Sequence, residues 1–157
     1  MTIKRFFRLK NSEQGIGLVE TIVALGVSLI VITSLVSLSV YVLRASQENR
    51  MMLTATDKAN EQLELLRAKR DTTTWDAFTL AMASCSSPTS VCVLTSLSGA
   101  PQAVTNTTQI NPNEVLVYFW AEGTGDLRRI HVEGAWMSGS TIRKVYNSTD
   151  LSNWRVQ

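Results

Sequence analysis

An uncharged stretch of 23 residues, from Thr21 to Leu43, constrains this 157-residue chain more than any other feature. A run of this length is long enough to cross the hydrocarbon core of a bilayer as a helix. A cleaved secretory signal has a shorter apolar core, roughly 7–15 residues, and a small-residue cleavage site follows it. We therefore expect the run to stay in the protein as a membrane anchor for one folded domain.

A short basic segment precedes the apolar run. Residues 1–15 contain four basic side chains and one acidic one, namely Lys4, Arg5, Arg8, Lys10 and Glu13. This charge excess predicts that the segment lies in the cytoplasm and that the C-terminal part of the chain lies outside. The remaining sequence is nearly neutral, with 11 basic against 12 acidic side chains. It contains no basic tract, so we expect no direct nucleic-acid site.

Glu20 is the one carboxylate between this segment and the apolar run, five residues after Gly15. An acid at the start of a membrane helix is unfavourable unless it has a partner or a function. The sequence Gly15-Ile16-Gly17-Leu18-Val19-Glu20 resembles the class III leader of type IV prepilins and type II secretion pseudopilins. Ile16 departs from the usual Phe or Met but is also bulky and apolar, and Gly17 departs from the usual Thr or Ser. The alternative is an ordinary single-pass anchor in which Glu20 has no special role.

The resemblance implies a processing and assembly pathway. A prepilin peptidase would cut after Gly15, Ile16 would become the N-methylated first residue, and Glu20 would pair with the amine of a neighbouring subunit. The implied partners are that peptidase, membrane lipid before assembly, other pilin subunits through the N-terminal helix, and an inner-membrane assembly platform. No cofactor or metal is implied.

The sequence after the leader predicts one uninterrupted helix from about residue 16 to residue 70, because it contains no proline before Pro88. The first half is apolar on all sides. The second half, residues 44–70, is amphipathic, with small and apolar residues at three- and four-residue spacing: Met52, Ala55, Ala59, Leu63 and Leu66. This face should pack on a folded domain.

Strand signals follow in the last third of the chain. Residues 115–121 are rich in β-branched and aromatic residues, 127–137 alternate between apolar and polar, and 141–146 form a third candidate strand. Short turns between them predict an antiparallel meander that needs cover on one face. The expected fold is therefore α+β: a long N-terminal helix packed on a small antiparallel sheet of about three to four strands, as in pilins.

The expected organisation has five parts: a leader at 1–15, the membrane half of the helix at 16–43, its amphipathic half at 44–70, a connecting loop at 71–114, and the sheet with the C-terminal tail at 115–157. Loops of this length are usually functional or mobile, so this one is a candidate partner surface. It contains both cysteines of the chain, Cys85 and Cys92. Outside the cytoplasm, two cysteines favour a disulfide over two free thiols.

No group of residues predicts catalysis. His131 is the only histidine and should face solvent on its alternating strand. Arg128-Arg129 and Arg143-Lys144 could gather into a small basic patch, although a solvated face is the simpler interpretation. The four tryptophans are best explained by packing. The sequence contains no nucleophile elbow, phosphate-binding loop or cluster with metal-ligand spacing.

These features together predict a non-enzymatic structural subunit, a minor pilin or pseudopilin of a type IV pilus-like filament. It would begin as a single-pass inner-membrane protein and end in an extracellular or periplasmic filament. The alternative function is a membrane-anchored extracytoplasmic binding or adhesion protein that does not assemble.

Overall fold

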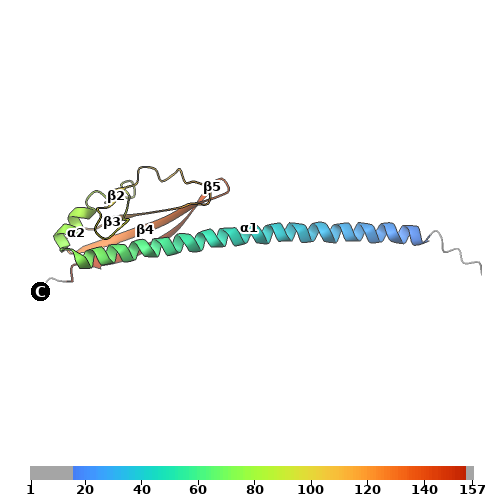
Figure 1. Cartoon of the computed structure of the whole chain (residues 1–157), viewed down its shortest axis with the longest axis horizontal. Coiled ribbons are helices and arrows are strands. Elements are labelled where there is room, and N and C mark those ends of the chain that lie inside the picture. The colour runs from blue at the N-terminus through green and yellow to red at the C-terminus, as the bar shows by residue number, and fades with distance from the viewer. Residues whose placement is uncertain (1–15, 155–157) are drawn as a thin grey trace, which may run out of the picture. The chain divides into compact units, whose positions relative to one another are not determined.

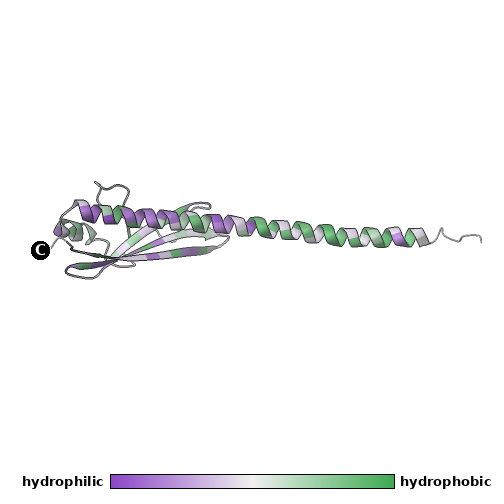
Figure 2. Ribbon diagram, turned by 90° about the horizontal axis from the view of Figure 1, so that it is seen from below, coloured by the Kyte–Doolittle hydropathy of each residue, from purple (hydrophilic) through white to green (hydrophobic). Residues whose placement is uncertain are grey.

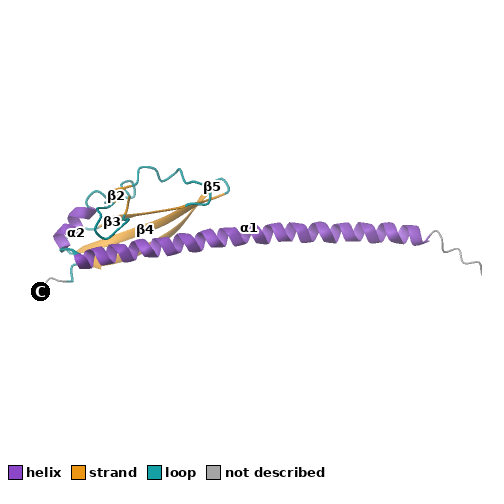
Figure 3. Cartoon of the chain, viewed as in Figure 1, coloured by secondary structure: helices purple, strands orange, loops and turns teal. Residues whose placement is uncertain are grey.

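A computed structural model of the chain describes residues 16–154. The elements, shown in Figure 1 and Figure 3, are α1 (Ile16–Thr72), α2 (Trp75–Met82), β1 (Cys92–Val93), β2 (Gln102–Ala103), β3 (Val115–Glu122), β4 (Leu127–Ser138) and β5 (Thr141–Ser152). The chain divides into two compact units, residues 1–45 and 46–157, and α1 contributes to both. The expected α+β architecture is confirmed, and the first helix ends two residues later than predicted.

The first unit consists, in its described part, of the apolar half of α1. Every residue from 17 to 44 is exposed, although the sequence there is almost entirely hydrophobic. Figure 2 shows this as a largely green helix that turns purple in its second half. By length and composition, α1 is the one helix among the described residues that is able to cross a membrane.

The second unit, which we call the head, is a five-stranded antiparallel sheet with the order β2-β1-β3-β4-β5, covered by the second half of α1. Three strands are long, as predicted, and two have only two residues each. Strands β1 and β2 were missed because they lie in a Ser- and Thr-rich segment without hydrophobic alternation. Helix α2 was also missed, and β5 extends to Ser152 rather than ending at residue 146.

The core lies between the sheet and one face of α1. Ala55, Ala59, Leu63 and Leu66 are at most 4% exposed, which confirms the predicted face. Met52 is an exception: its side chain is half exposed, and Met51 packs against the core instead. From the sheet, the alternate residues Ile130, Val132 and Trp136 of β4 belong to this core, in agreement with the predicted alternation of residues 127–137.

Gly134 allows α1 to approach the sheet closely. A Cβ atom at this position would lie only 2.9 Å from the carbonyl oxygen of Ala55 on α1 and 3.1 Å from Val145 on β5. The ladder from β4 to β5 passes through Gly134 without a bulge. Gly134 therefore marks close packing of the helix on the sheet and not a bulge.

Candidate functional site: the apolar helix and the disulfide-bonded loop

The predicted processing and assembly residues lie at the start of α1. Gly15 is outside the described residues, and α1 begins at Ile16, whose side chain is not described. Glu20 lies in the second turn of α1 and is exposed. Among residues 16–154 no hydrogen bond or ion pair involves its carboxylate.

The hydroxyl groups of the apolar half satisfy their hydrogen-bonding needs within the helix. Six of them donate to backbone carbonyls three or four residues earlier: Thr21, Ser28, Thr33, Ser34, Ser37 and Ser39. A membrane interior offers no water to these groups. The serine and threonine hydroxyl groups on the surface of this half are therefore already paired within the helix.

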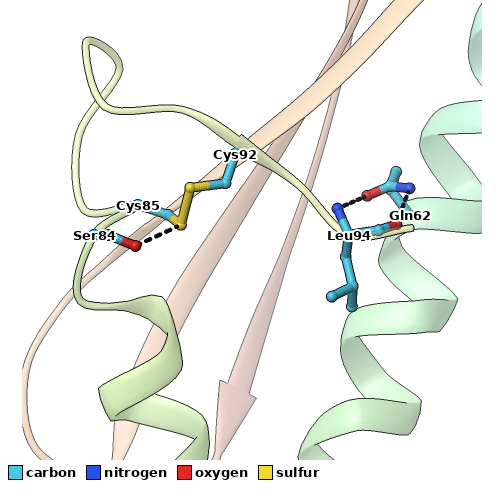
Figure 4. Close-up of a disulfide and its surroundings, with 5 residues drawn as sticks. All are labelled: Gln62, Ser84, Cys85, Cys92 and Leu94. Atoms are coloured by element: carbon cyan, nitrogen blue, oxygen red, sulfur yellow. Dashed lines mark hydrogen bonds between the residues drawn. A yellow bond between two sulfur atoms is a disulfide. The ribbon is translucent and has the colours of Figure 1, made fainter. Parts of the chain in front are cut away.

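A disulfide joins Cys85 to Cys92, as the sequence predicted (Figure 4). Both cysteines are fully buried in the core of the head. The carbonyl of Cys85 accepts a hydrogen bond of 2.7 Å from the amide of Ala121, and Cys92 pairs with Phe119, so both ends of the disulfide loop are tied to β3. Between them, residues 86–90 form a largely exposed, hydroxyl-rich tip, whereas Val91 is buried.

Two polar side chains of α1 hold the next part of this loop. The Gln62 amide donates to the Leu94 carbonyl at 2.8 Å and accepts from the Leu94 amide at 3.1 Å, as Figure 4 shows. Two turns later, the Lys69 ammonium donates to the carbonyls of Leu97 and Gly99 at 3.0 and 2.7 Å. Sequence reasoning missed both anchors, because each lies on the helix beside residues that resemble ordinary charged surface positions.

A second polar group lies on the face of the sheet opposite α1. Glu133 on β4 is 4% exposed, accepts a hydrogen bond from the Tyr118 hydroxyl, and pairs with Lys144 at 2.5 Å. Burial, together with this hydrogen bond and the negative charge of Glu133, raises the pKa of Tyr118 to about 12. The hydrogen bond to Glu133 also raises the pKa of Lys144. Glu133 alternates with the core residue Val132 and so lies on the face away from α1, but the sequence gives no sign that it is buried there.

The prediction that His131 faces solvent is wrong, and the basic patch considered as the less simple interpretation does not form. His131 is stacked on Trp120, with ring centroids 4.9 Å apart, and its Nε2 atom is buried 3.6 Å from Glu122, so it does not face open solvent. The basic residues form no patch. Adjacent residues of a strand point to opposite faces, and three of the four have acidic partners: Arg129 with Asp150, Lys144 with Glu133, and Arg143 with Glu48.

Within the described residues, no group of three or more His, Cys, Asp or Glu side chains is arranged to hold a metal ion. No protein-family model, curated protein or solved structure matches the chain.

Proposed function

We propose that this chain is a structural subunit, a minor pilin or pseudopilin, of a type IV pilus-like filament. The observation that carries the proposal is the sequence from Gly15 to Glu20, directly followed by an apolar helix surface exposed along its whole length. A soluble monomer rarely exposes an apolar surface of this size. Lipid would cover it before assembly, and the helices of other subunits would cover it afterwards.

Glu20 favours one axial register between neighbouring subunits during assembly. Cleavage after Gly15 removes the basic leader and creates an amine at Ile16. This amine can pair with Glu20 of a neighbouring subunit, which replaces an uncompensated acid in lipid by an ion pair. Methylation keeps the positive charge of the amine, so the pairing is not affected. The paired helices then form the centre of the filament, and the sheet domains form its outer layer.

Processing is tested by Gly15→Val, which places a branched side chain where the peptidase needs a small residue. We expect this variant to remain a full-length membrane precursor by mass spectrometry, whereas the wild-type chain begins with N-methylated Ile16. Removal of the 15-residue leader from the variant would contradict the class III assignment.

Assembly is tested by Glu20→Ala, with Glu48→Ala on the same helix as the matched control. We expect Glu20→Ala to be processed, to insert normally and to form its disulfide, but to be absent from sheared surface fibres. Glu48 lies in the head, where it accepts a hydrogen bond from Ser138, so its loss should affect the head and not the pairing. Equal recovery of Glu20→Ala and wild type in fibres would favour the alternative, a membrane-anchored binding protein that does not assemble.

A further inference from the structure

Lys69 is a buried cation without a carboxylate partner. Its side chain is 7% exposed, whereas Lys58 on the same helix is exposed. None of the ion pairs formed within residues 16–154 includes Lys69. A buried charge is strongly unfavourable unless other polar groups replace its water. At Lys69 the replacement comes from the carbonyl oxygens of Leu97 and Gly99.

These carbonyls belong to residues 94–101, which connect β1 to β2. The two strands form only two residue pairs, Cys92 with Ala103 and Val93 with Gln102. So short a hairpin contributes little stability to an eight-residue connection. The connection nevertheless forms a defined turn, in which the Gly99 amide donates to the carbonyl and hydroxyl oxygens of Ser96. Its order must therefore come from other contacts.

The turn is shaped so that its oxygen atoms converge on one positive charge. A Cβ atom on Gly99 would lie 2.9 Å from the Ser96 hydroxyl, so the glycine keeps the turn tight while its carbonyl points to Lys69. Lys69 also lies in the last turn of α1, where the helix dipole favours a positive charge. The ammonium group thus contacts backbone carbonyl oxygens at a helix C-terminus, and none of the described ion pairs gives it a carboxylate. Neutral carbonyl ligands of this kind suit a monovalent cation.

We propose that the turn at residues 96–99 and the last turn of α1 form a binding site for a primary ammonium ion, and that Lys69 fills this site with its own side chain. The ammonium group acts as a tethered ligand, and the turn takes its folded conformation around it. Removal of the side chain beyond Cβ leaves a vacant site of matching chemistry. A free alkylammonium ion should then bind in that site and restore the turn.

The test measures hydrogen exchange of the peptide 95–101 in the full-length chain in detergent, with tetramethylammonium chloride as the background salt. We expect Lys69→Ala to accelerate exchange of the Gly99 amide in this peptide by about tenfold or more, since opening of the turn breaks the hydrogen bonds of this amide to Ser96. Exchange in residues 115–138 should stay unchanged, which shows that the sheet is intact. Lys58→Ala is the matched control and should behave as wild type.

Rescue distinguishes the cation site from simple packing of the lysine stem. Added n-propylammonium should restore protection to Lys69→Ala, whereas n-propanol, which lacks the charge, should not. Lys69→Met keeps the apolar volume without the donors, so it should lose protection and should not respond to n-propylammonium. Unchanged exchange in Lys69→Ala, equal rescue by n-propanol, absence of rescue, or full protection in Lys69→Met would each overturn the proposal.

Discussion

At Gly134 the backbone of α1 approaches the sheet more closely than a side chain would permit. The nearest atom to a Cβ there is a backbone oxygen, that of Ala55, which cannot rotate away. A Cβ at Gly134 would also lie 3.3 Å from the Cβ of Ala55, which explains why a small residue occupies this point of the α1 face. The position of the helix on the sheet therefore depends on a residue that contributes no side-chain contact.

We expect Gly134→Val to reduce the free energy of unfolding by about 2–3 kcal/mol, the upper part of the usual range for an overpacked core. Chemical denaturation of the detergent-solubilised chain, followed by tryptophan fluorescence, measures the change. Ser148→Val is the control, because Ser148 lies on an exposed position of β5 where a valine meets no backbone. Equal stability of the two variants would show that α1 can move away from β4 without loss.

The pKa of Tyr118 predicts a loss of stability at high pH. Because the folded-state pKa is about 12, against 10.0 for the unperturbed group, the unfolded chain releases this proton at lower pH than the folded chain. The contribution is complete below pH 10 and is lost as the pH rises from about 10 to about 12. Lys144, whose pKa is also raised, acts in the same direction.

The measurement compares wild type with Tyr118→Phe, which lacks the titrating hydroxyl but keeps Lys144 and Glu133. We expect the denaturant midpoint of wild type to fall more steeply than that of the variant between pH 10 and pH 12. Parallel curves in this interval would mean that the Tyr118 hydroxyl ionises equally in the folded and unfolded chain.

Among the elements, β1 and β2 are the least able to form by themselves, because each contributes two residues. The disulfide and the pairing of Cys92 with Phe119 fix β1 to the rest of the head. Hydrogen bonds from Gln62 and Lys69 of α1 fix the connection between β1 and β2. The connecting loop is thus ordered by covalent and side-chain anchors rather than by its own propensity.

Loss of the disulfide should therefore weaken the head more than loss of nearby hydroxyls. The chain-entropy estimate for so short a loop is about 2.5 kcal/mol. We expect the double variant Cys85→Ala, Cys92→Ala to lose about this amount in chemical denaturation, since both side chains are buried in the core. The matched control is Ser86→Ala, Ser90→Ala in the same loop, at exposed positions. A difference of zero between the two double variants would show that the loop is held without its disulfide.

At the scale of the whole molecule, the two units differ in whether they bury their own apolar side chains. Residues 46–157 have a core of their own, formed by α1, α2 and all three long strands. Residues 17–44 have no core and expose apolar side chains throughout. The head therefore buries its own apolar side chains, whereas the apolar half of α1 does not, and by length and composition this half is able to cross a membrane.

We expect a chain that begins at Ser46 to fold as a soluble monomer with an oxidised disulfide, whereas the full-length chain enters the detergent phase in a phase-partition assay. Circular dichroism and size-exclusion chromatography of the shortened chain measure its fold and its oligomeric state. Aggregation or lack of cooperative unfolding would show that the head depends on the first unit.

The sequence by itself determined the long helix, the apolar exposure of its first half, the buried face of its second half, the three long strands and the cysteine pair. These features follow from local periodicity, from charge placement and from the count of cysteines, which need no knowledge of the chain path. The tertiary structure alone decided the burial of Glu133 with Tyr118 and Lys144 and the stacking of His131 on Trp120. It also decided the hydrogen bonds from Lys69 to the turn at 96–99. Each of these joins residues distant in sequence, so it depends on strand register and on the route of a loop that carries no periodic signal.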